Sequence, residues 1–484
     1  MNVLKRKTPS ALPVRVLQFG EGNFLRAFID WMFHEMNKQG KFNGMAQLVQ
    51  PLPSGMAEQI NAQDGLYTLI LRGIADGKTV EKREVIESVK GCLNPYENWN
   101  AVVECAVSND LRFVFSNTTE AGIEYKPEPY TPGKCQNTYP AKLTSLVFER
   151  WKAFRGDPSK GLVFVPCELI DHNGSTLKQC MKHYAADWKL PEEFSSWLDS
   201  ACLFVNTLVD RIVAGYPRGE AEKIEAELGY EDKLLDCGEI FHFFVIEGPQ
   251  SILKELPFTE CGLNVIVTEN QAPYRTRKVR FLNGAHTADV PAAILGGLTF
   301  VDEMMDDPVF GKMVRKAIYD EIFHTVELPD EEKKFFADSI VERFRNPFAH
   351  HRLLSISLNS ISKWKVRVLP SLLDYVRIKG ELPQVLAFSL AALLRFYRFE
   401  LDGEGKASGS YQEIRYPVSD SPDVLAFFAE TAKLPLKEAV GKALANTSFW
   451  GMDLNTVPGL AERVAEKMAL IDNAGIREAV KSIL

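Results

Sequence analysis

Short apolar runs alternate with amphipathic segments over the first half of the chain. Up to about Tyr274, β-branched and apolar runs are separated by stretches whose apolar positions recur every three or four residues. This order is typical of βαβ units and predicts a largely parallel sheet. The runs that we expect to form strands are Val14–Phe19, Met45–Leu52, Leu111–Phe115, Leu162–Val165, Phe241–Ile246 and Asn264–Val267.

A helix is expected directly after the first of these strands. Apolar residues recur at helical spacing from Phe24 to Met36, and Gly40 stands where such a helix would end. The sequence therefore predicts a strand, a glycine turn and a helix in immediate succession.

The pattern changes beyond Tyr274, where long helical segments are separated by short proline-containing breaks. No strand alternation is evident there, and Leu401–Ser410 is expected to be a polar loop. We therefore predict an α/β domain with a mostly parallel sheet over residues 1–274, followed by an all-α domain over residues 275–484.

The composition narrows the class of protein. The chain has 56 Lys and Arg against 64 Asp and Glu, a net charge of −8, and its apolar stretches Val290–Val301 and Val385–Leu394 are too short to cross a bilayer. This argues against nucleic acid or a membrane as a partner. The eight cysteines are scattered singly, as expected for reduced thiols in a cytoplasmic protein.

Two glycines, Gly20 and Gly22, lie between the first strand and the helix. In Rossmann-type domains, glycines at this turn let the backbone approach a dinucleotide pyrophosphate at the helix N-terminus. The third glycine of the usual fingerprint is replaced by Leu25. We expect a Rossmann-type dinucleotide-binding domain; the alternative is a tight turn that holds no ligand.

The second strand ends without the acidic residue that usually bonds the ribose of NAD, because Gln50 follows Val49. A cluster of small polar residues, Ser116–Gly122, follows a later strand. We expect Asn117 and Thr118 to contact the cofactor at this edge of the sheet, although a helix cap would use the same residues.

Lys278, Asn283 and His286 share one face of an expected helix that runs to about Gly297. A lysine can protonate a carbonyl oxygen, an asparagine amide can stabilise the developing alkoxide, and a histidine can orient the substrate. The alternative is a solvated basic helix face with a capping asparagine and a core histidine.

Several long motifs in the same order resemble the mannitol dehydrogenase family of polyol-specific long-chain dehydrogenases, and the similarity covers nearly the whole chain. They are Gln18–Arg26, Ser116–Gly122, Pro166–Asp171, Phe244–Pro249, Leu282–Thr287 and Arg343–Pro347. The resemblance implies an NAD-dependent oxidoreductase that acts on a CH–OH group.

The resemblance also implies roles for individual residues. Lys278 is the expected acid/base, Asn283 and Asn206 the oxyanion donors, His286 a substrate-orienting group and Lys363 a substrate contact. Read without the family, Asn206 would be a helix cap and Lys363 an exposed helix lysine. The cofactor contacts expected from the family are Phe19, Gly20, Gly22, Asn23, Phe24, Asn117 and Thr118.

The similarity is greatest to members that reduce the sugar acid tagaturonate to altronate with NADH. An arginine of the polyol enzymes is replaced here by Ser355. A substrate carboxylate needs a cationic partner, and the candidates near in sequence are Arg352, His351, Arg345 and Lys365.

Other functions remain open at this stage. Reduction of fructuronate or oxidation of a neutral hexitol would use the same motifs. An inactive nucleotide-binding regulator and a sugar-acid isomerase or dehydratase are more distant alternatives. We expect no metal, since His350 and His351 are adjacent and no spaced ligand motif occurs. A monomer or small homo-oligomer is expected.

Overall fold

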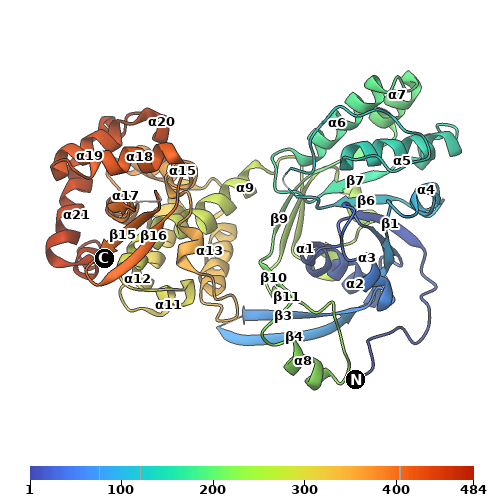
Figure 1. The fold of residues 1–484 in the computed structure, drawn as a ribbon, viewed down its shortest axis with the longest axis horizontal. Helices are drawn as coiled ribbons and strands as arrows, with labels where there is room; N and C mark the ends of the chain where they lie inside the picture. The colour runs from blue at the N-terminus through green and yellow to red at the C-terminus, as the bar shows by residue number, and fades with distance from the viewer. Residues whose placement is uncertain (76, 120, 403–404) are drawn as a thin grey trace. The chain divides into compact units, whose positions relative to one another are not determined.

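The computed structural model describes residues 1–75, 77–119, 121–402 and 405–484 (Figure 1). The chain divides into two compact units. The first consists of Met1–Arg72 and Thr79–Gln271, and the second of Gly73–Lys78 and Ala272–Leu484.

The first unit is built on a sheet of six parallel strands in the order β5-β2-β1-β6-β7-β8. Chain order reverses between β1 and β6, which is the switch point where ligands bind in doubly wound sheets. The strands are β1 (Val14–Phe19), β2 (Met45–Val49), β5 (Val89–Leu93), β6 (Phe113–Ser116), β7 (Val163–Pro166) and β8 (Leu203–Phe204).

Side chains of this sheet alternate between two apolar cores, one on each face. On β1, Val16 lies in one core, whereas Leu17 and Phe19 lie in the other. The helices of this unit are α1 (Asn23–Leu25), α2 (Trp31–Lys38), α3 (Ala57–Ala62), α4 (Trp99–Ala106), α5 (Tyr139–Ala153), α6 (Asn173–Asp187), α7 (Glu192–Ser200) and α8 (Ala221–Leu228).

Two smaller sheets complete the first unit's strand pairing. The predicted strands Phe241–Ile246 and Asn264–Val267 form as β12 (Phe243–Glu247) and β13 (Val265–Thr268). They lie outside the six-stranded sheet, in a sheet where β12 pairs with β13 on one side and with β9 (Asn206–Asp210) on the other. The other sheet, in the order β10-β11-β3-β4, was not predicted. It contains β3 (Tyr67–Ala75), β4 (Lys78–Ile86), β10 (Val213–Gly215) and β11 (Asp236–Glu239).

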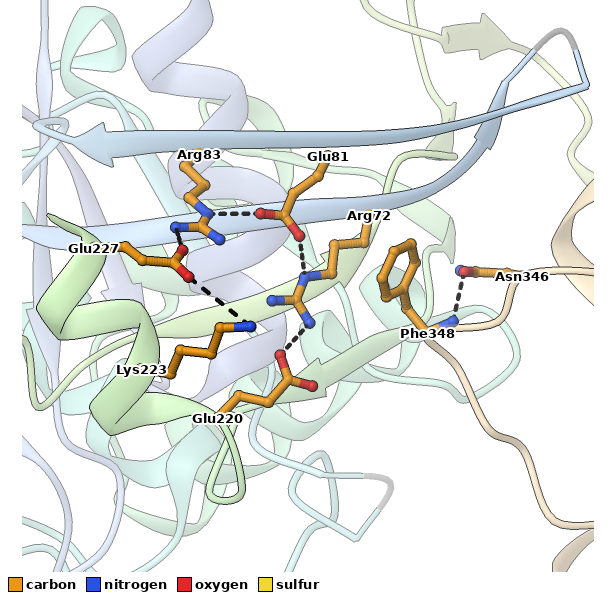
Figure 2. A network of polar contacts seen from close by, with 8 residues as sticks. All are labelled: Arg72, Glu81, Arg83, Glu220, Lys223, Glu227, Asn346 and Phe348. Atoms are coloured by element: carbon orange, nitrogen blue, oxygen red, sulfur yellow. Dashed lines mark hydrogen bonds and ion pairs between the residues drawn. The ribbon is translucent and has the colours of Figure 1, made fainter.

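A chain of ion pairs joins this sheet to α8 (Figure 2). Arg72 contacts Glu81 and Glu220, each at 2.8 Å. Arg83 in turn contacts Glu81 and Glu227, each at 2.6 Å. Glu81 and Arg83 of β4 are thus both paired. Most positions of this strand are polar, so it lacks the apolar alternation by which a strand is predicted from sequence.

The second unit is mainly helical, and the helices α10 and α17, both rich in buried residues, pack against each other at its centre. Its helices are α9 (Ala272–Lys278), α10 (Ala285–Leu295), α11 (Val301–Asp306), α12 (Phe310–Lys316), α13 (Asp330–Phe344), α14 (Leu353–Ile356), α15 (Ser360–Arg367), α16 (Leu369–Lys379), α17 (Gln384–Phe396), α18 (Pro422–Thr431), α19 (Leu436–Ala445), α20 (Thr447–Trp450), α21 (Leu460–Ala474) and α22 (Ile476–Lys481).

The expectation of a second unit without strands was wrong. A three-stranded antiparallel sheet is formed by β14 (Phe399–Leu401), β15 (Ala407–Tyr411) and β16 (Ile414–Val418). The predicted loop Leu401–Ser410 therefore overlaps two strands, and its residues 403 and 404 lie outside the described part. In β15 the inward positions include Ala407 and Gly409, whose small side chains carry little apolar signal.

The apolar stretch Val385–Leu394 lies within α17, whereas Val290–Val301 begins in α10, continues beyond its end at Leu295 and reaches the start of α11. Within the described residues, no helix combines the length and the apolar character needed to cross a membrane. All eight cysteines are free thiols.

Candidate active site

The glycine turn follows β1 at the switch point of the six-stranded sheet. Gly20 has φ +116°, and a Cβ there would lie 2.8 Å from the carbonyl oxygen of Asn117. Gly22 differs, because a Cβ on it would meet no atom within 4 Å. Glycine is therefore required at Gly20 by the backbone, whereas Gly22 leaves open space at the start of α1.

A cavity of about 390 Å³ lies beside this turn, at the carboxyl ends of the strands. Its lining includes Gly20, Gly22, Pro51, Asn117, Thr118 and Tyr139. The position matches the crevice where open α/β sheets bind dinucleotides.

Buried polar side chains hold the backbone of the glycine turn in place. Gln18 Nε2 donates to the carbonyl oxygen of Gly20 at 3.1 Å and to Asp30 Oδ2 at 3.2 Å. Burial raises the pKa of Asp30 to about 7, against a weaker lowering by the Gln18 hydrogen bond and Arg26. The backbone that faces the cavity is therefore fixed by side chains that do not line it.

Five of the predicted cofactor contacts have side chains that pack on or bond to other parts of the protein, and one of these is Thr118, whose hydroxyl donates to Glu168. Phe19 is fully buried and packs on Tyr139, with ring centroids 5.1 Å apart, and Phe24 stacks on Phe28. Asn23 Oδ1 accepts from Arg26 at 2.6 Å, and Asn117 Nδ2 donates to the carbonyl oxygen of Cys167 at 2.9 Å.

Glu168, just beyond β7, organises the loop that contains Asn117 and Thr118. Its carboxylate accepts hydrogen bonds from the Ser116 hydroxyl and from both the backbone N–H and hydroxyl of Thr118, each at 3.0 Å. Burial raises the pKa of Glu168, and these hydrogen bonds act against that rise. Glu168 belongs to the motif Pro166–Asp171, but its role could not be predicted from the sequence, because its partners lie at the end of another strand and in the loop after it.

Gln50, which replaces the usual acidic residue, is 2% exposed and serves the adjacent loop. Its amide donates to the carbonyl oxygens of Leu52 and Pro53, and its Oε1 accepts from the N–H of Ala57 at 3.2 Å. Glu21 lies next to it, lines the cavity and accepts from the N–H of Met56 at 3.3 Å. Glu21 is thus an acidic cavity residue that the sequence pattern did not single out.

Asn206 begins β9 in the first unit. Its Oδ1 accepts from the N–H of Ser175 at 2.9 Å, and its Nδ2 donates to Glu247 at 2.8 Å. Glu247 also accepts from the N–H of Gln271 at 2.9 Å. The amide of Asn206 is consequently held in one orientation, with its second N–H hydrogen still available.

Lys278, Asn283 and His286 all lie in the second unit, but not on one regular helix. Lys278 ends α9, a π-helical turn spans Val279–Gly284, and α10 then begins. The expected uniform helical angles between the three residues were therefore wrong. Such π turns occur often at functional sites.

Tertiary packing accompanies this π turn. A Cβ on Gly284 would come within 3.0 Å of the carbonyl oxygen of Arg367, in the last turn of α15. The glycine permits this close approach between the π turn and α15. Among the described residues, no side-chain hydrogen bond engages the amide of Asn283, which is half-buried.

His286 is 8% exposed and stacks on Phe344, with ring centroids 3.9 Å apart, while the ring of His351 meets it edge-on at 5.5 Å. Burial lowers the pKa of His286 well below its usual 6.5, with further lowering by His351, Arg343 and Arg367. At neutral pH the imidazole is therefore uncharged and can both donate and accept a hydrogen bond.

The predicted substrate-binding residues are only partly brought together. His351 lies beside His286, and Lys363 acts electrostatically on His351, whose pKa is lowered first by burial and then by that lysine. Arg352 is instead exposed and lies over the ring of Phe300, 5.4 Å from its centroid. Arg345 pairs with Asp306 at 3.3 Å.

One group of three potential metal ligands lies together in the described residues: His34, Glu35 and Glu84. The ammonium of Lys38 contacts both carboxylates of this group. The group is outside the turn and cavity described above.

Residues 14–260 match the mannitol dehydrogenase Rossmann domain, and residues 270–472 match the mannitol dehydrogenase C-terminal domain. The chain belongs to the mannitol dehydrogenase family. The family assignment confirms the predicted class of enzyme, an oxidoreductase of CH–OH groups, and the α/β plus helical architecture.

Two altronate oxidoreductases align with this chain over nearly its full length. It is 45% identical to the altronate oxidoreductase of Cronobacter sakazakii, with 98% of each chain covered. It is 42% identical to the altronate oxidoreductase of Halalkalibacterium halodurans, with 100% of this chain and 95% of the other covered.

Solved structures of dehydrogenases share the fold of this family member. A D-sorbitol dehydrogenase in substrate-free form aligns with a TM-score of 0.79 at 21% identity, covering 99% of this chain and 100% of the other. The Pseudomonas fluorescens mannitol 2-dehydrogenase, in a ternary complex with NAD and D-mannitol, aligns with a TM-score of 0.66 at 19% identity, covering 99% and 96%.

Proposed function

We propose that this member of the mannitol dehydrogenase family reduces tagaturonate to altronate with NADH, reversibly. The observation that carries the proposal is the 42–45% identity to altronate oxidoreductases over essentially the whole of both chains. The free amide of Asn283 and the uncharged His286 support the same chemistry.

The residues around the glycine turn fit a nicotinamide dinucleotide. Gly22 leaves room for the pyrophosphate at the start of α1, and the neighbouring cavity of about 390 Å³ is lined by Gly20, Asn117 and Thr118. We assign backbone contacts to Phe19 and Gly20, and further contacts to Asn23, Phe24, Asn117 and Thr118. Bound NADH supplies a hydride to the carbonyl carbon of the substrate.

The chain itself supplies the proton and the oxyanion site. Lys278 donates a proton to the ketone oxygen as the carbon gains the hydride, which gives the secondary alcohol. Asn283 and Asn206 donate hydrogen bonds to the oxygen while it carries negative charge. His286, uncharged at neutral pH, orients the substrate hydroxyls, and His351, Arg352 and Lys363 are assigned to substrate binding.

We further propose that residues 1–274 bind the cofactor and residues 275–484 carry the substrate and catalytic groups. A cytoplasmic location agrees with eight free cysteines, and a sugar acid is the only partner that the activity needs. A monomer or small homo-oligomer would suffice.

The test is loss of NADH absorbance with tagaturonate, fructuronate or fructose in separate reactions, repeated with NADPH. Rapid oxidation of NADH with tagaturonate is expected. Turnover of another ketose instead would change the assigned substrate but leave the proposed mechanism intact. No turnover with any of the three would contradict the proposed activity.

A further inference from the structure

Helix α15 packs against the Asn283–His286 segment and carries two cationic residues. Lys363 and Arg367 are four residues apart on this helix and so share a face. The carbonyl oxygen of Arg367 faces Gly284, which separates Asn283 from Ala285. The last turn of α15 thus packs on the π turn that contains Asn283.

Arg367 influences the pKa of both Lys363 and His286, which indicates that the three basic groups form one cluster. Burial and then Arg367 lower the pKa of Lys363, and Arg367 also contributes to the low pKa of His286. Burial lowers the pKa of Arg367 as well. The opposing anion is Asp420, which raises the pKa of Lys363 but already accepts from the Tyr397 hydroxyl and the N–H of Ile361.

Arg367 differs in its partners from Arg345 and Arg352, the two arginines that the sequence offered as carboxylate partners. Arg345 is paired with Asp306, and Arg352 lies over Phe300. Within the described residues, by contrast, the half-buried guanidinium of Arg367 has no carboxylate within 4.0 Å and donates no hydrogen bond. Partial burial of a cation without a partner is unfavourable, so an anionic ligand at this position would be favoured.

A second unpartnered group points to the same place. His286 is more than nine-tenths buried, yet its ring nitrogens have no hydrogen-bond partner among the described residues. A ligand that bonds the imidazole and places an anion near Arg367 would satisfy both groups.

We propose that Arg367, assisted by Lys363, binds the carboxylate of the substrate and so selects sugar acids over neutral ketoses. A guanidinium presents parallel N–H donors that match a carboxylate, a geometry that an ammonium cannot reproduce. The assignment rests on the proposed function and names the residue that makes the substrate class specific.

The experiment compares kcat/KM for tagaturonate with kcat/KM for tagatose, the neutral ketose in which CH₂OH replaces the carboxylate. In Arg367→Met we expect kcat/KM to fall about 10- to 100-fold for tagaturonate and by less than about threefold for tagatose, as for loss of a charge-assisted hydrogen bond. Arg367→Lys should recover part of the loss. Arg377→Met, which removes an exposed arginine of α16 paired with Asp374, is the matched control and should leave both values unchanged.

The outcomes separate this inference from the proposed function. An equal fall for both substrates, or no fall for tagaturonate, would overturn the role of Arg367 while the wild-type rate with tagaturonate still supported the activity. A wild-type enzyme that reduced only neutral ketoses would overturn both. If the wild type preferred fructuronate, the same ratio taken against fructose would decide the role of Arg367.

Discussion

The glycine turn of the first unit and the Lys278–His286 segment of the second use polar side chains in opposite ways. Around the glycine turn, Gln18, Gln50 and Glu168 are buried and bonded to the protein, so they hold backbone in place. In the second unit, Asn283 and His286 have no such bonds within the described residues.

The ligands that we propose for the two regions would account for this difference. A dinucleotide pyrophosphate is met by backbone N–H groups, so a rigid turn suffices. The hydroxyl groups and the reacting carbonyl of a sugar acid need side-chain donors and acceptors that face particular oxygens. Such side chains must remain without protein partners until the substrate binds. Substitutions at the glycine turn should therefore change backbone conformation, and with it stability and cofactor binding. Substitutions in the Lys278–His286 segment should change the rate of the reaction.

The largest effect is expected from Lys278→Ala. Loss of a positioned proton donor should lower kcat about 10²- to 10⁴-fold, while the Kd for NADH changes little because the lysine lies outside the glycine turn. Steady-state kinetics and titration of NADH fluorescence measure the two quantities. A variant that kept more than about a tenth of the wild-type kcat would remove Lys278 from the role of acid/base.

Alanine substitutions at Gly20 and Gly22 distinguish two reasons for a glycine at the turn: the backbone conformation at Gly20 and the space for a ligand at Gly22. Gly20→Ala forces a Cβ into a left-handed conformation, 2.8 Å from a carbonyl oxygen, and should cost about 1–3 kcal/mol of folding free energy through backbone strain alone. We expect a lower Tm and weaker NADH binding.

Gly22→Ala is the control for Gly20→Ala, because the φ of Gly22 is −70° and no atom lies within 4 Å of the added Cβ. It should keep the wild-type Tm but bind NADH more weakly, since the methyl group takes space assigned to the pyrophosphate. Equal Tm values for both variants would show that the turn is not strained by a side chain at Gly20.

Asp30 beneath the turn should make stability depend on pH. Its pKa is raised from 3.8 to about 7 by burial, so the unfolded chain releases this proton at a lower pH than the folded protein does. The free energy of unfolding should therefore fall as pH rises from about 4 to about 7, by up to about 1.4 kcal/mol per pH unit from this group. Urea unfolding of the wild type and of Asp30→Asn measures the dependence, and identical slopes for the two proteins would contradict it.

The smallest effect is expected from Glu168→Gln. The amide keeps one acceptor oxygen but turns an NH₂ group toward the Ser116 hydroxyl or the N–H of Thr118. Losing one such buried hydrogen bond costs about 1–2 kcal/mol, and the Kd for NADH should rise up to about 10-fold with kcat nearly unchanged. A fall in kcat without a change in Kd would place Glu168 in the chemistry and not in the support of the loop.

Local signals were enough to predict the parts of the first unit that depend on neighbours in sequence. The run Val14–Phe19 has the bounds of β1, and Gly20 after it marks the turn because its positive φ requires glycine. The partners of Glu168 and Gln50 could not be predicted, since the bonds join segments that only the sheet order brings together.

In the second unit the chemistry of Lys278, Asn283 and His286 could be proposed from residue type, but their geometry could not. The π turn packs against Arg367, more than 80 residues along the chain, through the carbonyl oxygen near Gly284. The sheet from β14 to β16 was not predicted because the buried positions Ala407 and Gly409 of β15 carry little apolar surface.

The burial of His286 determines how a pH–rate profile of this enzyme can be interpreted. Because the imidazole stays uncharged well below pH 6.5, it does not change charge across the neutral range. An inflection between pH 6 and 8 in kcat/KM would therefore report a different group or a change in the substrate complex, although a histidine would be the usual first assignment.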